Sequence, residues 1–202
     1  MIHSSGEERR WLRRHGIAPR KRLGQNFLVR PDVAGRLAER MPIGERTEVV
    51  EIGAGGGALT RALLERGATV HAVEIDLRLV SLLEDRFRVP ISEGRLRLHA
   101  GNILDLDPAS LARKPGGRLY AAGNLPYAIT TPILLWLLGA RSRLDGAAVL
   151  VQREVADRLA SAPGDPAYGS LTVWISYHAG VGKLAGVRRG SFWPVPSVDS
   201  TL

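Results

Sequence analysis

A glycine-rich segment between two acidic residues carries the strongest local signal in the sequence. Glu51 precedes three alternate glycines, Gly53, Gly55 and Gly57, and Glu74 ends the next strand-like run. Glycines permit a tight turn and a close approach of the backbone to a ligand, and a carboxylate at a strand end can accept both hydroxyls of a ribose. The pattern therefore predicts a site for a nucleotide-like cofactor.

On spacing alone this segment fits two cofactor classes. Gly53, Gly55 and Ala58 match the dinucleotide pattern G-x-G-x-x-G/A, and residues 51–57 equally match the acidic-G-x-G-x-G loop of S-adenosylmethionine enzymes. A sulfonium ligand is cationic near its reacting centre, whereas a pyrophosphate is anionic, so the carboxylate of Glu51 favours the sulfonium. A tight strand-to-helix turn without any ligand remains the alternative.

A second constellation, Asn124, Leu125, Pro126 and Tyr127, follows a predicted strand. The Asn124 side-chain oxygen and a backbone carbonyl can together accept both protons of an exocyclic amine, and Pro126 lacks a competing N–H. Tyr127 offers a ring on which a base can stack. Taken alone, the segment is more typical of a plain proline turn beside a core tyrosine.

A third constellation is the aromatic pair Phe192 and Trp193, which is followed by Pro194 and Pro196. A rigid extended segment presents an aromatic side chain at low entropic cost, as in the binding of an extruded base. A hydrophobic plug on the core is the alternative.

The elements that must position these residues alternate between strand and helix, which is typical of an α/β fold with a mostly parallel sheet. Strands are expected at 47–52, 69–74, 95–99, 118–122 and 147–151, and helices at 31–41, 58–66, 77–87, 132–138 and 153–160. The segments 178–187 and 198–202 resemble a closing pair of strands, whereas 168–177 is ambiguous between helix and strand.

The composition bounds the class of protein. With 202 residues, 45% of them hydrophobic, the chain can form one core without a metal or disulfide, and the absence of cysteine excludes a thiol nucleophile and a Cys-ligated metal site. The five histidines lack metal-ligand spacing, so no metal is expected. The longest apolar run, 133–138, is far shorter than the ~20 residues that span a bilayer, and residues 1–16 do not resemble a secretory signal. A soluble cytoplasmic protein is expected.

Most of the net charge of +8 lies in residues 1–30, which hold eight Lys/Arg and two Glu. Such a basic arm suits a polyanion through phosphate neutralisation. A solvated helix face is the alternative. The expected division is a basic arm over 1–30 and an α/β domain over 31–202.

Seven motifs together resemble, in order, the ribosomal RNA adenine N6-dimethyltransferase family. They are LGQNFL (23–28), EIGAGGGALT (51–60), VEID (73–76), GNLPY (123–127), VQREVADRL (151–159), AYGSL (167–171) and FWPVPSVDS (192–200). The resemblance begins near Arg20. NLPY followed by ITTP is more similar to the KsgA-type enzymes of the small subunit than to erythromycin-resistance enzymes, whose second motif residue is commonly Ile.

The resemblance implies a class I S-adenosylmethionine-dependent methyltransferase with a seven-stranded, mostly parallel sheet. Its expected reaction is dimethylation of N6 on two adjacent adenines of small-subunit ribosomal RNA, as part of ribosome maturation. The expected partner is this RNA in the small ribosomal subunit or its precursor. The protein is expected to be a monomer and not to bind a membrane. Family members carry a helical C-terminal domain, which is expected to be absent here.

The resemblance also implies roles for individual residues. Gln25, Asn26 and Leu28 would lie at the methionine end of the cofactor, with Glu51, Gly53, Gly55 and Gly57 forming its loop, and Glu74, Ile75, Gly101, Asn102, Ile103 and Asn124 completing its site. The residues expected to bind RNA are Arg20, Lys21 and Arg22. Where the family typically has an Asp, this chain has Asn102, which still accepts a hydrogen bond from the adenine amine but without charge assistance, at a cost of about 1 kcal/mol.

The expected catalytic residues are Asn124, Leu125, Pro126, Tyr127 and Phe192. Asn124 and the Leu125 carbonyl would accept the two N6 protons, and Tyr127 and Phe192 would stack on the base for ~1 to 3 kcal/mol per base. Three alternatives are an NAD-dependent oxidoreductase, a large-subunit methyltransferase of the erythromycin-resistance type, and a non-catalytic RNA-binding assembly factor.

Overall fold

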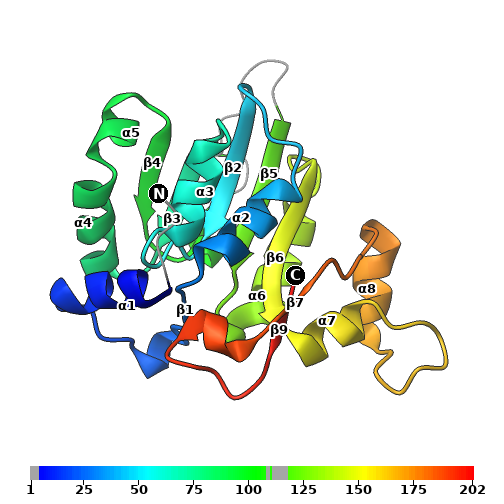
Figure 1. Cartoon of the computed structure of the whole chain (residues 1–202). Coiled ribbons are helices and arrows are strands. Elements are labelled where there is room, and N and C mark those ends of the chain that lie inside the picture. The colour runs from blue at the N-terminus through cyan, green and yellow to red at the C-terminus, as the bar shows by residue number, and fades with distance from the viewer. Residues whose placement is uncertain (1–4, 108–109, 111–117) are drawn as a thin grey trace.

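A computed structural model describes residues 5–107, 110 and 118–202. Its centre is a seven-stranded sheet of order β4-β3-β2-β5-β6-β9-β7 (Figure 1). The strands are β2 (Thr47–Ile52), β3 (Thr69–Glu74), β4 (Leu96–Ala100), β5 (Arg118–Asn124), β6 (Gly146–Gln152), β7 (Gly186–Val187) and β9 (Ser200–Thr201). The helices are α1 (Ser5–Arg14), α2 (Pro31–Glu39), α3 (Ala58–Glu65), α4 (Leu77–Arg86), α5 (Arg88–Ser92), α6 (Thr130–Gly139), α7 (Arg153–Leu159) and α8 (Ser170–His178).

The sheet topology places a ligand crevice at its middle. Strands β4, β3, β2, β5 and β6 are parallel, and β9 pairs antiparallel with both β6 and β7. The chain progresses from β2 to one side through β3 and β4, and then to the other side through β5 and β6. In open α/β sheets, ligands bind at the carboxyl ends of strands where the strand order reverses. Here that point lies between β2 and β5, whose carboxyl ends point downward in Figure 1.

Alternate residues of the central strands build two apolar cores. Val49, Val70 and Ala72 face the side covered by α2 and α3, whereas Val50 and Ile52 face the side covered by α6. The α6 helix is apolar on several sides, but it buries Ile133, Leu134, Leu137 and Leu138 against the sheet and leaves Leu135 exposed. The central strands are thus fixed on both faces, which gives rigid support to the residues at their ends.

The sequence-based expectations for the sheet are confirmed with small shifts at strand ends. The ambiguous segment 168–177 contains a helix, α8, and the expected helix 77–87 ends one residue earlier and is followed by α5. The expected strands 178–187 and 198–202 are wrong in length, because only β7 and β9 pair. Gly180 and Gly182 lie in the exposed stretch before β7, where glycine weakens a strand.

The basic segment over residues 5–30 packs onto the α/β domain rather than extending away from it. Leu12, Ile17 and Phe27 are buried in one apolar cluster with residues of α4. A short strand, β1 (Phe27–Leu28), pairs antiparallel with β8 (Phe192–Trp193), which ties this segment to the end of the chain. In the part of the chain that the structure describes, no helix is both long and apolar enough to span a membrane.

Candidate active site

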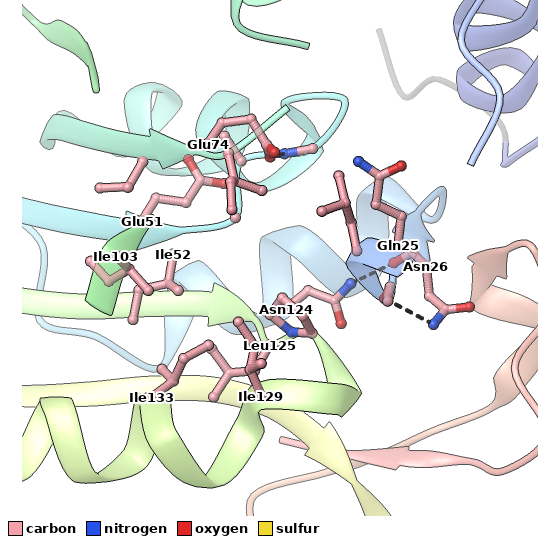
Figure 2. Close-up of a pocket in the computed structure, with 18 of the residues that line it drawn as sticks. Gln25, Asn26, Glu51, Ile52, Glu74, Ile103, Asn124, Leu125, Ile129 and Ile133 are labelled. Atoms are coloured by element: carbon pink, nitrogen blue, oxygen red, sulfur yellow. Dashed lines mark hydrogen bonds between the residues drawn. The ribbon is translucent and has the colours of Figure 1, made fainter. Parts of the chain in front are cut away.

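A cavity of about 260 Å³ lies at the carboxyl ends of the central strands (Figure 2). Its walls come from five parts of the chain that are distant in sequence. These are the segment 22–28, the glycine loop after β2, the ends of β3 and β4 and the residues that follow them, and the segment that follows β5. The segments expected to hold a cofactor and a base therefore meet in one place.

The glycine loop adopts backbone angles that only glycine accepts readily. Gly53 and Gly55 have φ of 73° and 56°, and the Gly55 amide donates a 2.9 Å hydrogen bond to Glu74. Gly57 also has a positive φ but does not line the cavity. A Cβ on Gly57 would approach the Phe87 ring to 2.5 Å, so packing against the end of α4 explains this glycine, and its expected role in the cofactor loop stays a prediction.

Glu74 and its neighbours form the end of the cavity that suits a nucleoside. Each carboxylate oxygen of Glu74 accepts one backbone N–H, from Gly55 and from Asp76, and retains a lone pair for a ribose hydroxyl. Ile75, which is 48% exposed, and the buried Ile103 offer apolar surface for a flat ring.

Asn102 and Gly101 complete this end of the cavity. The Asn102 side-chain oxygen accepts a 3.1 Å hydrogen bond from the Leu104 amide and so caps the short helix Ile103–Asp105. The same oxygen keeps a second lone pair, because a carbonyl oxygen can accept two hydrogen bonds. A hydrogen bond from an adenine amine is therefore compatible with this cap.

Glu51 is buried at the base of the cavity beside Glu74. Thr60 donates a 2.6 Å hydrogen bond to one carboxyl oxygen, and the other, Oε1, has no partner among the described residues. Burial, followed by the charge of Glu74, raises the pKa of Glu51 to about 8. Without a ligand Glu51 is therefore mostly a neutral acid at neutral pH, and the carboxylate expected from the sequence would form only beside a bound cation.

Asn124 presents a buried acceptor to the cavity (Figure 2). Its amide nitrogen donates a 2.7 Å hydrogen bond to the Asn26 carbonyl. This contact fixes the orientation of the amide, so that its oxygen points away from Asn26. The side-chain oxygen of Asn124 is buried without a partner in the described chain. Among the same residues, none donates a backbone hydrogen bond to the neighbouring Leu125 carbonyl. Two acceptors suited to an amine therefore stand next to each other.

Gln25 lines the cavity, but both ends of its side-chain amide are occupied, one by the Arg20 backbone amide and the other by Asp76. Its oxygen accepts from the Arg20 amide at 2.8 Å, and its nitrogen donates to Asp76 at 3.0 Å. Asp76 also accepts hydrogen bonds from the side chains of Arg20 and Arg78, and the Arg78 hydrogen bond is the main cause that lowers the pKa of Asp76 to about 2. This buried anchor was not predicted from the sequence, where its visible signal is an Asp two residues after Glu74.

The two rings expected to stack on a base do not reach the cavity wall. Phe192 is 1% exposed and packs in the core, because its pairing with Leu28 turns the ring inward. Tyr127 is half-buried beside the cavity-lining Pro126, and its hydroxyl makes a 2.9 Å hydrogen bond with Ser200. Pro126 and Leu28 do line the cavity. The burial of Phe192 corrects the stacking role expected of that ring, whereas the stacking role of Tyr127 stays a prediction.

The three cations expected to meet RNA differ in their surroundings. Lys21 and Arg22 are exposed, and Arg22 lies on the rim of the cavity. The Arg20 guanidinium lies 3.4 Å from Asp76 and is partly buried. Within residues 5–107, 110 and 118–202, no group of three His, Asp or Glu side chains is arranged to hold a metal ion.

Known proteins share this sequence and architecture. Residues 17–202 match the family model described as "Ribosomal RNA adenine dimethylase". The chain is 42% identical over 192 residues to "Ribosomal RNA small subunit methyltransferase A" of Geobacter metallireducens, covering 95% of this chain and 69% of that protein.

Solved structures are similar as well. A dimethyladenosine transferase from Plasmodium falciparum gives a TM-score of 0.72 at 30% identity, over 85% of this chain and 59% of that one. The 23S rRNA methyltransferase ErmE gives 0.71 at 29% identity, over 87% of this chain and 67% of that one. The expected fold, the methyltransferase class and the cofactor S-adenosylmethionine are confirmed, and the chain belongs to the ribosomal RNA adenine dimethylase family.

Proposed function

We propose that this chain transfers methyl groups from S-adenosylmethionine to N6 of two adjacent adenines of small-subunit ribosomal RNA, giving N6,N6-dimethyladenosine. The observation that carries the proposal is the buried, unpartnered side-chain oxygen of Asn124, whose direction is fixed by Asn26. The choice of the small subunit is supported by the 42% identity to a protein named as a small-subunit methyltransferase.

The residues of the cavity fit the cofactor. Glu74 retains acceptor capacity for a ribose, Ile75 and Ile103 offer surface to an adenine, and the orphaned oxygen of Glu51 offers a partner to a cationic methionine group. Bound S-adenosylmethionine supplies an electrophilic methyl group on its sulfonium. The chain's own contribution is to place the adenine and to shape its amine.

The amine of adenine is a poor nucleophile because its lone pair is delocalised into the ring. The Asn124 side-chain oxygen and the Leu125 carbonyl each accept a hydrogen bond from the N6 amine. These two hydrogen bonds draw the nitrogen toward tetrahedral geometry and localise its lone pair. After transfer the alkylated amine is acidic and loses a proton to water, so no strong base is required. Preorganised acceptors and proximity supply most of the rate enhancement.

The RNA is met by exposed cations beside the cavity. Lys21 and Arg22 are positioned to neutralise phosphates at the point where an extruded adenine would enter. The chain acts as a cytoplasmic monomer on the small ribosomal subunit or its precursor, because so large a substrate needs open access to this edge of the sheet.

The deciding experiment is transfer of labelled methyl to unmodified small and large ribosomal subunits, followed by digestion of the RNA to nucleosides. Labelled N6,N6-dimethyladenosine in small-subunit RNA is expected. Label confined to large-subunit RNA would favour an activity like that named for ErmE. Binding of the cofactor and the subunit without transfer would favour a non-catalytic assembly factor.

A further inference from the structure

Helix α1 lies against the side of the glycine loop that faces away from the cavity. Glu8 and Arg86 form a two-pronged ion pair there, with N–O distances of 2.6 and 2.8 Å. Their side chains are only 5% and 10% exposed. The Arg86 guanidinium also donates a hydrogen bond to the carbonyl of Gly56, a loop residue that lines the cavity. One guanidinium thus joins α1, α4 and the cofactor loop.

The surroundings of this ion pair hold the loop closely. The Trp11 ring centre lies 3.8 Å from the Arg86 guanidinium carbon, which is within cation–π range. A Cβ on Gly56 would come within 3.0 Å of a Glu8 oxygen and 3.1 Å of Leu12. The loop is therefore enclosed by α1 on one side and faces the cofactor cavity on the other.

Removing one member of the pair has consequences at the loop. Without Glu8, Arg86 would lose its counter-ion beside Arg61, whose pKa is lowered first by burial and then by the Arg86 charge. Without the Arg86 fork, the Gly56 carbonyl would lose a charge-assisted hydrogen bond, a stronger type than a neutral one. The turn in which the Gly57 amide donates to the Ala54 carbonyl lies directly beside this carbonyl.

We propose that Glu8 and Arg86 are positioning residues that fix the conformation of the cofactor loop from behind, without touching the cofactor. The family model begins at residue 17, so α1 lies outside the matched region and contributes this support from beyond it. The proposal rests on the proposed function, in which the loop binds S-adenosylmethionine. It adds Glu8 and Arg86 to the residues that determine the affinity for this cofactor.

The decisive variants separate the ion pair from its contact with the loop. Arg86→Lys retains a cation for Glu8 but lacks the fork that reaches Gly56, and should weaken S-adenosylmethionine binding about 10-fold by calorimetry. The double variant Glu8→Arg/Arg86→Glu restores an opposite-charge pair but places an acceptor opposite the Gly56 carbonyl. It should recover thermal stability relative to Glu8→Arg alone while cofactor affinity stays low.

Two matched controls and one ligand-free measurement complete the test. Asp85→Asn removes an exposed ion pair with Arg88 that does not touch α1, and should leave cofactor affinity unchanged. Leu159→Ala destabilises the core on the far face of the sheet and should lower the melting temperature with affinity retained. Hydrogen exchange of the Gly57 amide without ligand should accelerate in Arg86→Lys and in the double variant, but not in the two controls.

The outcomes distinguish this proposal from the proposed function. If Arg86→Lys binds the cofactor as the wild type does, or if the charge swap restores affinity together with stability, the positioning role is overturned. If the wild type itself binds no S-adenosylmethionine, the proposed function fails, and the exchange of the Gly57 amide still decides whether the pair orders the loop.

Discussion

Asn124 donates a 2.7 Å hydrogen bond to the carbonyl of Asn26, which lies 98 residues earlier in the chain. This contact fixes the orientation of the amide, because the nitrogen is engaged and the oxygen is left buried without a described partner. An unsatisfied buried acceptor is costly unless a ligand pairs with it. The segment 22–28 thus orients the group proposed to bind the target amine.

The first prediction concerns this acceptor. Asn124→Ala should lower the single-turnover rate of methyl transfer about 100-fold, by analogy with removal of one preorganised hydrogen-bonding group from an active site. Cofactor affinity, measured by calorimetry, should fall much less. Asn26→Ala is the comparison, because the accepting carbonyl belongs to the backbone and is retained, so a smaller loss of rate is expected. A rate within a few-fold of wild type for Asn124→Ala would refute the proposed role.

The second prediction follows from the protonated state of Glu51. Its pKa of about 8 means that a cationic ligand, which favours the carboxylate, should expel close to one proton at pH 7. Calorimetric titrations with S-adenosylmethionine in buffers of different ionisation enthalpy measure this release. Glu51→Gln should remove it, and since the ligand's own ammonium contributes equally to both proteins, the difference isolates Glu51. Equal release from both would exclude Glu51 as the partner of the cation.

The same pKa predicts how stability depends on pH without ligand. Because the pKa of Glu51 rises from 4.5 to about 8 on folding, its contribution is fully present below pH 4.5 and is lost as pH rises through 8. The loss amounts to at most about 5 kcal/mol. Urea unfolding from pH 5 to 9 should therefore show a shallower decline for Glu51→Gln than for wild type; parallel curves would contradict the assignment.

The third prediction tests the anchor at Asp76. Asp76→Asn should release the segment 22–28, since Gln25 and Arg20 both bind this carboxylate, and should cost about 2 kcal/mol in unfolding free energy. Cofactor affinity should fall as well because the segment forms one wall of the cavity. Asp32→Asn, which removes a half-exposed ion pair with Arg30, is the matched control and should change neither quantity appreciably.

The contacts of Asp76 and Phe192 could not be predicted from the sequence, whereas the sheet and the glycine loop could. Strand and helix periodicity predicted the sheet, and the order of strands then placed the glycine loop and Asn124 at one edge. The hydrogen bond between Asp76 and Gln25 joins residues 51 positions apart and leaves no local pattern in the sequence. The inward turn of Phe192 depends on the pairing of two short strands, and an aromatic–proline motif alone does not reveal which way its ring faces.

The fourth prediction concerns the adenine end of the cofactor site. Asn102→Asp keeps the cap on the Leu104 amide, because a carboxylate oxygen accepts the same hydrogen bond. It also makes the expected contact with the adenine amine charge-assisted, which should tighten cofactor binding about 5-fold. Calorimetry on the two proteins at one pH measures the difference. Unchanged or weaker binding by Asn102→Asp would show that Asn102 does not receive the amine.

The last prediction separates the RNA contacts from the cofactor site. Lys21→Ala should weaken binding to unmodified small ribosomal subunits and should reduce the slope of log affinity against log salt concentration by roughly one, because one phosphate contact is lost. Arg22→Ala should do the same and can also alter cofactor binding, since Arg22 lines the cavity rim.

Lys183→Ala is the matched control for Lys21→Ala. Lys183 is half-exposed but is paired with Asp157 at 2.9 Å, next to α7 and away from the cavity. Lys183→Ala should leave the slope of log affinity against log salt concentration unchanged. If Lys21→Ala, Arg22→Ala and Lys183→Ala all gave the wild-type slope, the RNA would bind to another surface. Since salt screens phosphate contacts more than enclosed polar contacts, cofactor affinity of Lys21→Ala should match wild type at every salt concentration tested.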